Sequence, residues 1–251
     1  MGDPLRLYGL NALVLNAAGG ISEAIARTLI KHGATVLAVD TKNSGVEQHY
    51  ASVKGITGKA AAILDPDQLP GVVEDAVEKL GGIDILIIDF PLQPDTPLDQ
   101  VDDKLERLLQ SRVALTTAIS RASLPHLKKS PQGRIISIGF LRSCFAANGE
   151  AANAHAEQDL AKMTHALAAE TGEFAITVNY IQPGAVMTPE SRDVFQKDTA
   201  LRDYCIRGSA ARRLGEPVDV AKVALFLASS DAVFVSGTGI AVDGGRTRQT
   251  V

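Results

Sequence analysis

Residues 13–24 read Leu-Val-Leu-Asn-Ala-Ala-Gly-Gly-Ile-Ser-Glu-Ala, and this stretch decides the fold. Its apolar start is typical of a buried strand, and the residues from Ile21 onward have the spacing of a helix. Gly19 and Gly20 permit a tight turn and a close approach to a pyrophosphate, which the N–H groups at the helix start can bind. Asp40 ends the next apolar run, about twenty residues on, where a carboxylate can accept hydrogen bonds from the ribose hydroxyls of an adenosine. The stretch predicts a dinucleotide crossover that favours NAD over NADP; the alternative is a tight turn with no cofactor.

Short apolar runs alternate with helical patterns along the whole chain. Several runs are apolar without alternation, as expected for a parallel sheet covered by helices on both faces. The predicted strands are 12–16, 35–40, 60–64, 83–88, 134–138, 175–181 and 239–242. The predicted helices are 21–32, 69–80, 102–127, 151–171 and 218–227. This order predicts an α/β fold with a doubly wound parallel sheet in three α/β/α layers, as a single domain over residues 1–251. Residues 183–213 are predicted to form a loop or a lid.

The composition excludes several classes of partner. The formal net charge is −4 and there is no basic run, so neither nucleic acid nor an anionic membrane surface is an expected partner. Cys144 and Cys205 form neither a metal-ligand spacing nor a disulfide framework. No apolar run reaches the length of a membrane span, and residues 1–10 lack the apolar core of a signal peptide. We therefore expect a cytoplasmic protein without a metal site.

Further segments complete a resemblance to the short-chain dehydrogenase/reductase superfamily that covers nearly the whole chain. They are residues 64–66, 82–86, 133–136, 177–189, 213–217 and 237–245. The resemblance implies a Rossmann fold, a homodimer or homotetramer, NAD(P) at the carboxyl edge of the sheet, and hydride transfer on an alcohol or ketone. The cofactor-binding positions that it implies fall on Gly19, Gly20, Ile21, Asp40, Asp65, Pro183, Gly184 and Thr188.

The cofactor motifs depart from the family pattern at several positions. In the glycine-rich loop, Asn16 replaces the first glycine, Gly20 matches the second and Ser22 replaces the third. The Asn-Asn-Ala-Gly that follows the fourth strand of the family is Ile-Asp-Phe-Pro over residues 88–91. Phe90 and Pro91 therefore stand where small residues let the cofactor lie. On these grounds we expect NAD binding to be weak or absent.

The four catalytic positions of the family are all substituted. Its relay Asn, its Ser, its Tyr and its Lys fall on Arg112, Phe140, Asn153 and Glu157. The chemistry needs an acidified phenol, a hydroxyl that holds the carbonyl oxygen, and a proton relay. An amide cannot act as the acid, a phenyl ring cannot donate a hydrogen bond, and a carboxylate raises the pKa of a neighbouring acid. A Tyr-x-x-x-Lys match at residues 50–54 lies on the adenine side and is interpreted as coincidence.

Three hypotheses about function follow from this conflict. The first is a non-catalytic structural or regulatory subunit, assembled with an active homologue that performs NAD-dependent hydroxyacyl or alcohol dehydrogenation. The second is an NAD-dependent oxidoreductase with non-standard site residues, or a cofactor-free lyase or isomerase that uses Arg112 and Glu157. The third is a cofactor-free module that binds a small acidic or acyl ligand.

Two structural expectations accompany these hypotheses. Arg112 and Glu157 are predicted to form an ion pair that closes the vacated site, because a buried carboxylate needs a cation, a proton or water. The residues that are candidates to join them are Asp89, Arg142, Cys144 and Glu150. The alanine-rich stretch 151–161 predicts close packing of the fifth long helix against a second subunit, which makes the protein a homo- or hetero-oligomer.

Overall fold

The computed structural model describes residues 6–90, 103–139 and 150–245. Its centre is a parallel sheet of seven strands in the order β3-β2-β1-β4-β5-β6-β7. The strands are β1 (Asn11–Leu15), β2 (Thr35–Asp40), β3 (Ile56–Ala60), β4 (Ile85–Ile88), β5 (Arg134–Ile138), β6 (Thr177–Pro183) and β7 (Gly239–Val242). Leu13 on β1 pairs with Leu37 on β2 and with Leu86 on β4, so β1 lies between the two halves of the sheet.

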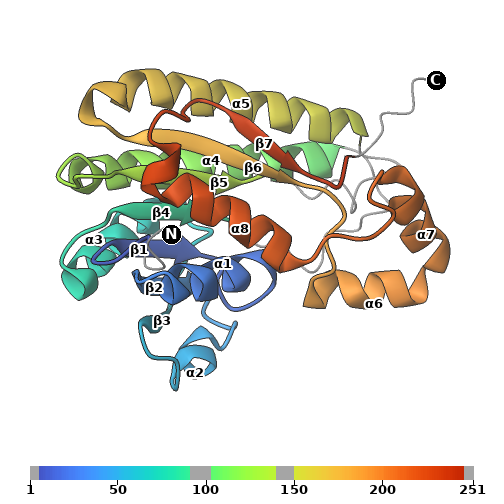
Figure 1. Cartoon of the computed structure of the whole chain (residues 1–251), viewed down its shortest axis with the longest axis horizontal. Coiled ribbons are helices and arrows are strands. Elements are labelled where there is room, and N and C mark those ends of the chain that lie inside the picture. Colours follow the sequence, from blue (N-terminus) through green and yellow to red (C-terminus); the bar gives the residue numbers. More distant parts are fainter. Residues whose placement is uncertain (1–5, 91–102, 140–149, 246–251) are drawn as a thin grey trace.

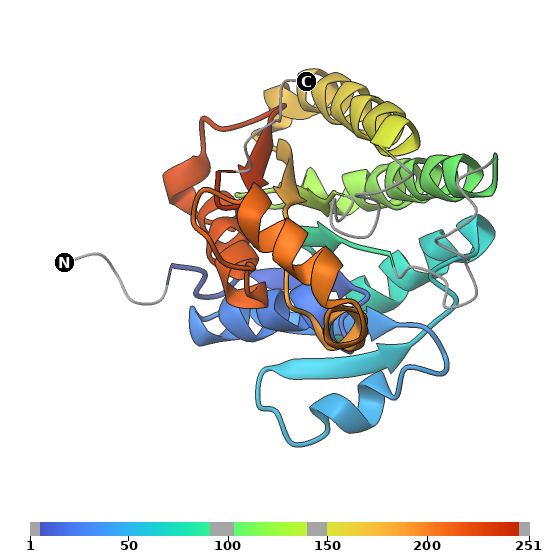
Figure 2. The same ribbon diagram turned by 90° about the vertical axis from the view of Figure 1, so that its right-hand side faces the viewer.

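Alternate residues of each inner strand enter two hydrophobic clusters, one on each face of the sheet. Ala12 and Val14 join the cluster under α1 (Gly20–Lys31) and α8 (Pro217–Ala228). Leu13 and Leu15 join the cluster under the remaining long helices. These helices are α3 (Leu69–Leu80), α4 (Asp103–Leu127) and α5 (Glu150–Thr171). Helices therefore cover both faces, which gives the predicted three-layer Rossmann fold (Figures 1 and 2).

The third strand differs from the prediction. The apolar run 60–64 was expected to be a strand, whereas β3 occupies Ile56–Ala60 at the edge of the sheet. An edge strand is half solvated, so its sequence Ile-Thr-Gly-Lys-Ala lacks the apolar run by which buried strands are found. Gly58 lets β3 approach α2 (Val46–Tyr50), because a Cβ there would lie 2.3 Å from the carbonyl oxygen of Val46.

The predicted loop or lid contains two helices, α6 (Pro189–Lys197) and α7 (Thr199–Gly208). Each begins at a polar cap, since Thr188 and Ser191 form a capping box on α6 and Asp198 accepts from the N–H of Leu201 on α7. The two helices follow the carboxyl end of β6 and lie at the right of Figure 1. Three 3₁₀ turns complete the described structure, η1 (Pro66–Gln68), η3 (Gly172–Phe174) and η4 (Ser230–Ala232). Within the described ranges, no helix is long and apolar enough to span a bilayer.

Candidate dinucleotide site

The sheet order reverses between β1 and β4, and such a switch point opens a crevice at the carboxyl ends of the strands. The chain leaves β1 through a turn into α1, whose first residues face this crevice. Gly19 is extended at φ −169° and Gly20 has φ +60°, a left-handed conformation that favours glycine. Because the residue before α1 is a glycine, no side chain caps the N–H groups of the first turn. These N–H groups are suited to an anion such as a pyrophosphate.

A carboxyl group stands on the opposite side of the switch point, at the end of β4. Asp89 Oδ2 accepts a hydrogen bond from Asn16 Nδ2 at 3.0 Å and another from Ser22 Oγ at 3.0 Å. Burial raises the pKa of Asp89 above its usual range. The hydrogen bond from Asn16, the charge of Arg112 and the hydrogen bond from Ser22 oppose this rise without cancelling it. Asp89 therefore holds its proton to a higher pH than an ordinary aspartate.

A second carboxylate holds the turn from the other side. Asp40, at the end of β2, is 4% exposed, and its Oδ2 accepts from the backbone N–H of Ala18 at 2.8 Å. Its Oδ1 accepts from the N–H of Thr41 at 2.6 Å. Asp40 was predicted to bind ribose; the contacts that the structure shows for it are those that fix the turn before α1.

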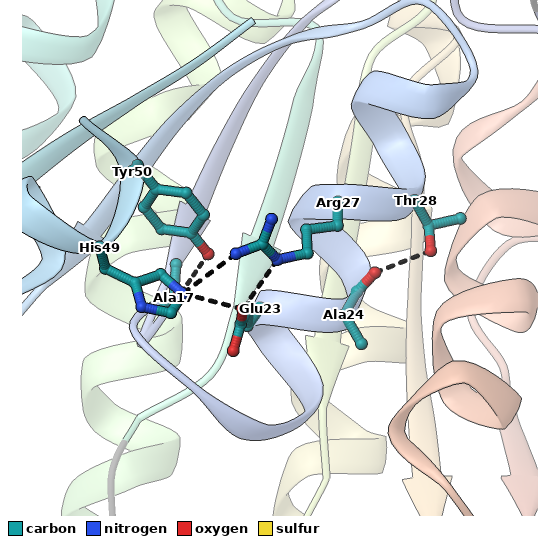
Figure 3. Close-up of polar contacts among 7 residues, drawn as sticks. All are labelled: Ala17, Glu23, Ala24, Arg27, Thr28, His49 and Tyr50. Carbon is teal, nitrogen blue, oxygen red and sulfur yellow. Dashed lines mark hydrogen bonds and ion pairs between the residues drawn. The ribbon is translucent and has the colours of Figure 1, made fainter. Parts of the chain in front are cut away.

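Polar side chains from α1 and α2 form a cluster beside the same turn (Figure 3). The hydroxyl of Tyr50 donates to the carbonyl oxygen of Ala17, and the guanidinium of Arg27 lies 5.6 Å from the centre of the Tyr50 ring. Glu23 accepts from Arg27 Nε at 2.7 Å and contacts His49 Nε2 at 2.8 Å. Burial acts to raise the pKa of Glu23, but the hydrogen bonds and charges of Arg27 and His49 lower it overall.

Tyr50, the first residue of the Tyr-x-x-x-Lys match at residues 50–54, belongs to this cluster. Burial, followed by the charge of Glu23, raises the pKa of Tyr50 above that of an ordinary phenol. A tyrosine that acts as a proton donor needs the opposite shift. The raised pKa and the hydrogen bond to Ala17 agree with the interpretation of the match as a coincidence.

The other predicted cofactor positions lie at the end of β6, in the loops that follow β3 and β6, and in the first turn of α1. Pro183 ends β6, and a Cβ on Gly184 would lie 2.7 Å from Asp243 Cα, so this close crossing requires glycine. The Thr188 hydroxyl accepts from the N–H of Ser191 at 3.2 Å. Asp65 accepts from the N–H of Asp67 at 3.1 Å and so caps η1. Ile21 is buried with 5% exposure, so the part of it that faces the crevice is its backbone.

Phe90 does not obstruct the cofactor site, contrary to the prediction. This side chain is 4% exposed and packs in the cluster under α3, α4 and α5. It therefore belongs to the core and does not cover the crevice. Pro91 lies outside the described residues. The uncapped start of α1 and the glycine crossing at Gly184 fit a dinucleotide.

The substituted catalytic positions divide into two groups. Phe140 lies outside the described residues, as do Arg142 and Cys144, and nothing is described of the side chains of Asn153 and Glu150. Arg112 on α4 and Glu157 on α5 are half-buried.

No ion pair between Arg112 and Glu157 is seen among the described residues, contrary to the prediction. Among the described side chains, Glu157 accepts a hydrogen bond from Gln182 Nε2, at the end of β6. Arg112 instead acts through its charge on Asp89. The prediction was wrong because alignment with the family motifs gives the position of a residue along a helix or strand. It does not show which neighbour a long side chain contacts.

The lid carries a cleft of about 270 Å³, which the sequence did not predict. It is lined by Met187, Arg192, Phe195, Gln196 and Arg202. Arg202 pairs with Asp203 beside it in sequence, at 3.2 Å. Across the described part of the chain, no three His, Cys, Asp or Glu side chains gather as a metal site would require. Cys205 is a buried cysteine.

Comparison with known proteins covers almost the whole chain. Residues 17–247 match the model of the family described as enoyl-(acyl carrier protein) reductase. A 3-oxoacyl-[acyl-carrier-protein] reductase of Salmonella typhimurium is 30% identical over an alignment of 244 positions that covers 96% of this chain and 98% of the relative. The corresponding reductase of Vibrio cholerae is 29% identical with the same coverage. The oxidoreductase UcpA of Escherichia coli is 29% identical over an alignment of 253 positions that covers 96% of this chain and 96% of the relative.

These relatives overturn the first hypothesis about function. A non-catalytic subunit was expected because all four catalytic positions are substituted, yet the full-length relatives are named as reductases or as an oxidoreductase. The findings favour the alternative of an oxidoreductase with non-standard site residues. The chain belongs to the enoyl-(acyl carrier protein) reductase family, within the short-chain dehydrogenase/reductase superfamily.

Proposed function

We propose that this protein is an oxidoreductase that binds a nicotinamide dinucleotide in the crevice between β1 and β4 and acts on a carbonyl or hydroxyl group of an acyl substrate. The observation that supports this most directly is the start of α1. There Gly19 and Gly20 open a helix whose N–H groups no side chain caps, at the switch point of the sheet. The names of the full-length relatives supply the substrate class.

Each part of the dinucleotide has residues suited to it. The backbone of Gly20 and Ile21 would hold the pyrophosphate, and Asp40 would lie beside the adenosine ribose, where its charge favours NAD over NADP. The loop with Gly184 and Thr188 would hold the nicotinamide end, and Asp65 lies beyond β3 on the adenine side. When bound, the cofactor supplies or accepts the hydride.

The charge that develops on the substrate oxygen needs a partner on the protein. The position of the family's serine is Phe140 and that of its tyrosine is Asn153, so neither supplies a hydroxyl. Arg112 is a permanent cation, and its Nε and Nη2 atoms are buried. A cation in a water-poor site stabilises an oxyanion more strongly than it would in bulk water. We assign this role to Arg112.

The lid cleft favours a substrate with an anionic group. Arg192 and Arg202 face it together with the apolar Met187 and Phe195. Guanidinium groups bind carboxylates and phosphates through paired hydrogen bonds, and the apolar neighbours suit an acyl chain. A coenzyme A or carrier-linked 3-oxoacyl thioester has both features.

The experiment is a titration with NAD and NADP, followed by an assay of acetoacetyl-coenzyme A reduction with NADH. We expect dinucleotide binding and measurable turnover, and we expect Arg112→Gln to lower kcat/KM by about a hundredfold, a typical effect of losing an oxyanion partner. Arg121→Gln is the matched control, since Arg121 lies on the same helix in an exposed pair with Glu170. A homogeneous sample that binds neither dinucleotide and shows no turnover would refute the proposal.

A further inference from the structure

Three departures from the family pattern converge on one carboxyl group. Asn16 replaces a glycine, Ser22 replaces a glycine, and Asp89 stands in the segment that reads Asn-Asn-Ala-Gly in the family. In the structure, Asn16 Nδ2 and Ser22 Oγ both bond to Oδ2 of Asp89, each at 3.0 Å. Substitutions that each argued against cofactor binding are therefore direct partners across the switch point.

The conformation of Asn16 explains why it needs a partner. Its φ is +55°, in the left-handed region that a glycine enters freely and most side chains avoid at a cost of about 1–2 kcal/mol. Asparagine tolerates this region better than most residues. The hydrogen bond to Asp89 fixes its side chain and so favours the turn that a glycine would otherwise supply.

Ser22 faces the same group from the first turn of α1. Its side chain is 0% exposed and its hydroxyl points to Asp89, so it turns inward, away from solvent. Serine is larger than glycine, but its side chain therefore does not cover the uncapped N–H groups of α1. Asp89 holds both substituted positions in the arrangement that keeps these groups accessible.

We propose that Asp89 is a positioning residue for the dinucleotide: its carboxyl clamps Asn16 and Ser22 and so keeps the start of α1 open to a pyrophosphate. This inference rests on the proposed function, because it specifies how the same crevice binds its cofactor. Asp89 replaces the conformational role of the two missing glycines and does not touch the reacting atoms.

The clamp makes a prediction that a purely structural residue would not. An ionised Asp89 would add a negative charge close to the site of the pyrophosphate, whereas a neutral carboxyl would not. Burial favours the neutral form, and Arg112 on α4 is the charged side chain that opposes it among the described residues. A neutral side chain that keeps the acceptor should therefore hold both partners without placing a charge beside the pyrophosphate.

The test measures the Kd of NAD by calorimetry. Asp89→Ala is expected to weaken NAD binding about tenfold, which is about 1.4 kcal/mol. Asp89→Asn retains an oxygen that accepts from Asn16 and Ser22, so it is expected to keep the affinity. In the Asn16→Gly/Ser22→Gly background, Asp89→Ala is expected to have little effect, since glycines need no clamp.

Asp84→Asn is the matched control. Asp84 lies just before the opposite end of the same strand, where it accepts from the N–H of Asn11 and from Ser130 Oγ. The clamp is refuted if wild type binds NAD and Asp89→Ala binds it equally well, or if the loss is the same in the glycine background. It is also refuted if Asp89→Asn, which keeps the acceptor, weakens NAD binding about tenfold, a result that decides the matter even where Asp89→Ala does not fold. A wild-type protein that binds no dinucleotide overturns both this inference and the proposed function, so the two failures are distinguishable.

Discussion

Replacing Tyr50 by phenylalanine tests how the turn before α1 is held. Tyr50 is 2% exposed, and its hydroxyl donates to the carbonyl oxygen of Ala17, a residue that is fully buried. Phenylalanine keeps the ring and its contacts with Arg27 and His49 and removes the donor alone. A buried acceptor that loses its donor costs about 1–3 kcal/mol, so the free energy of unfolding is expected to fall by that amount.

The assay is unfolding by urea and by heat. In a chain of this size each kcal/mol lowers Tm by about 2–4 °C, which is easily resolved. Tyr8→Phe is the control, because Tyr8 is 79% exposed, and exposed substitutions usually change stability by less than about 0.5 kcal/mol. If Tyr50→Phe is as stable as Tyr8→Phe, the hydroxyl does not hold the turn.

The pH dependence of the same variant gives an independent check. Burial and the charge of Glu23 raise the pKa of Tyr50 in the folded protein above its value in the unfolded chain, which is about 10. The unfolded chain thus loses this proton at a lower pH than the folded protein. The stabilisation is complete below about pH 10 and is lost as the pH rises above it. The stability difference between wild type and Tyr50→Phe should therefore shrink in that window, and a constant difference would contradict the burial argument.

Three further predictions concern the crevice, the lid and assembly. Asp40→Ser should reduce the preference for NAD over NADP, measured as the ratio of the two Kd values, because it removes the charge that repels a 2′-phosphate; an unchanged ratio would count against this role. Replacing Arg192 and Arg202 by glutamine should raise KM for acetoacetyl-coenzyme A but leave KM for an uncharged 3-oxoacyl ester unaltered; equal changes for both would exclude an anion site. Ala154 is exposed on α5, and Ala154→Arg should lower the mass measured by light scattering if α5 packs against a second subunit; a wild-type monomer at micromolar concentration would refute the interface.

Buried inner strands were predicted more accurately than the exposed edge strand β3. β2 and β5 occupy the predicted residues 35–40 and 134–138, because inner strands covered on both faces have apolar runs that differ clearly from their surroundings. β3 was predicted four residues too late, because an edge strand carries polar residues that the period does not distinguish from a loop. The lid helices α6 and α7 were missed for a related reason: many of their residues are exposed, and their caps, Thr188 and Asp198, lie in a polar stretch.

The site was harder to predict than the fold because its contacts join distant parts of the chain. Asn16 and Asp89 are separated by 73 positions, and Ser22 and Asp89 by 67. A single sequence presents each of these residues as a separate loss from a known motif, and adding the losses led to the expectation of an absent cofactor. These losses were not independent of one another, because substitutions of residues in contact do not have additive effects on stability.

The mistaken expectation about function has the same physical origin. A motif residue is required because some atom must fill a conformational, electrostatic or hydrogen-bonding role, and the motif records one residue that fills it. At position 16 the role is a left-handed turn, which Asn16 fills with the help of Asp89. At position 112 the family has a neutral amide and this protein has a cation, whose charge already acts on the group at the end of β4. A lost motif residue therefore argues against a function only when no neighbouring atom in the folded protein can take over its role.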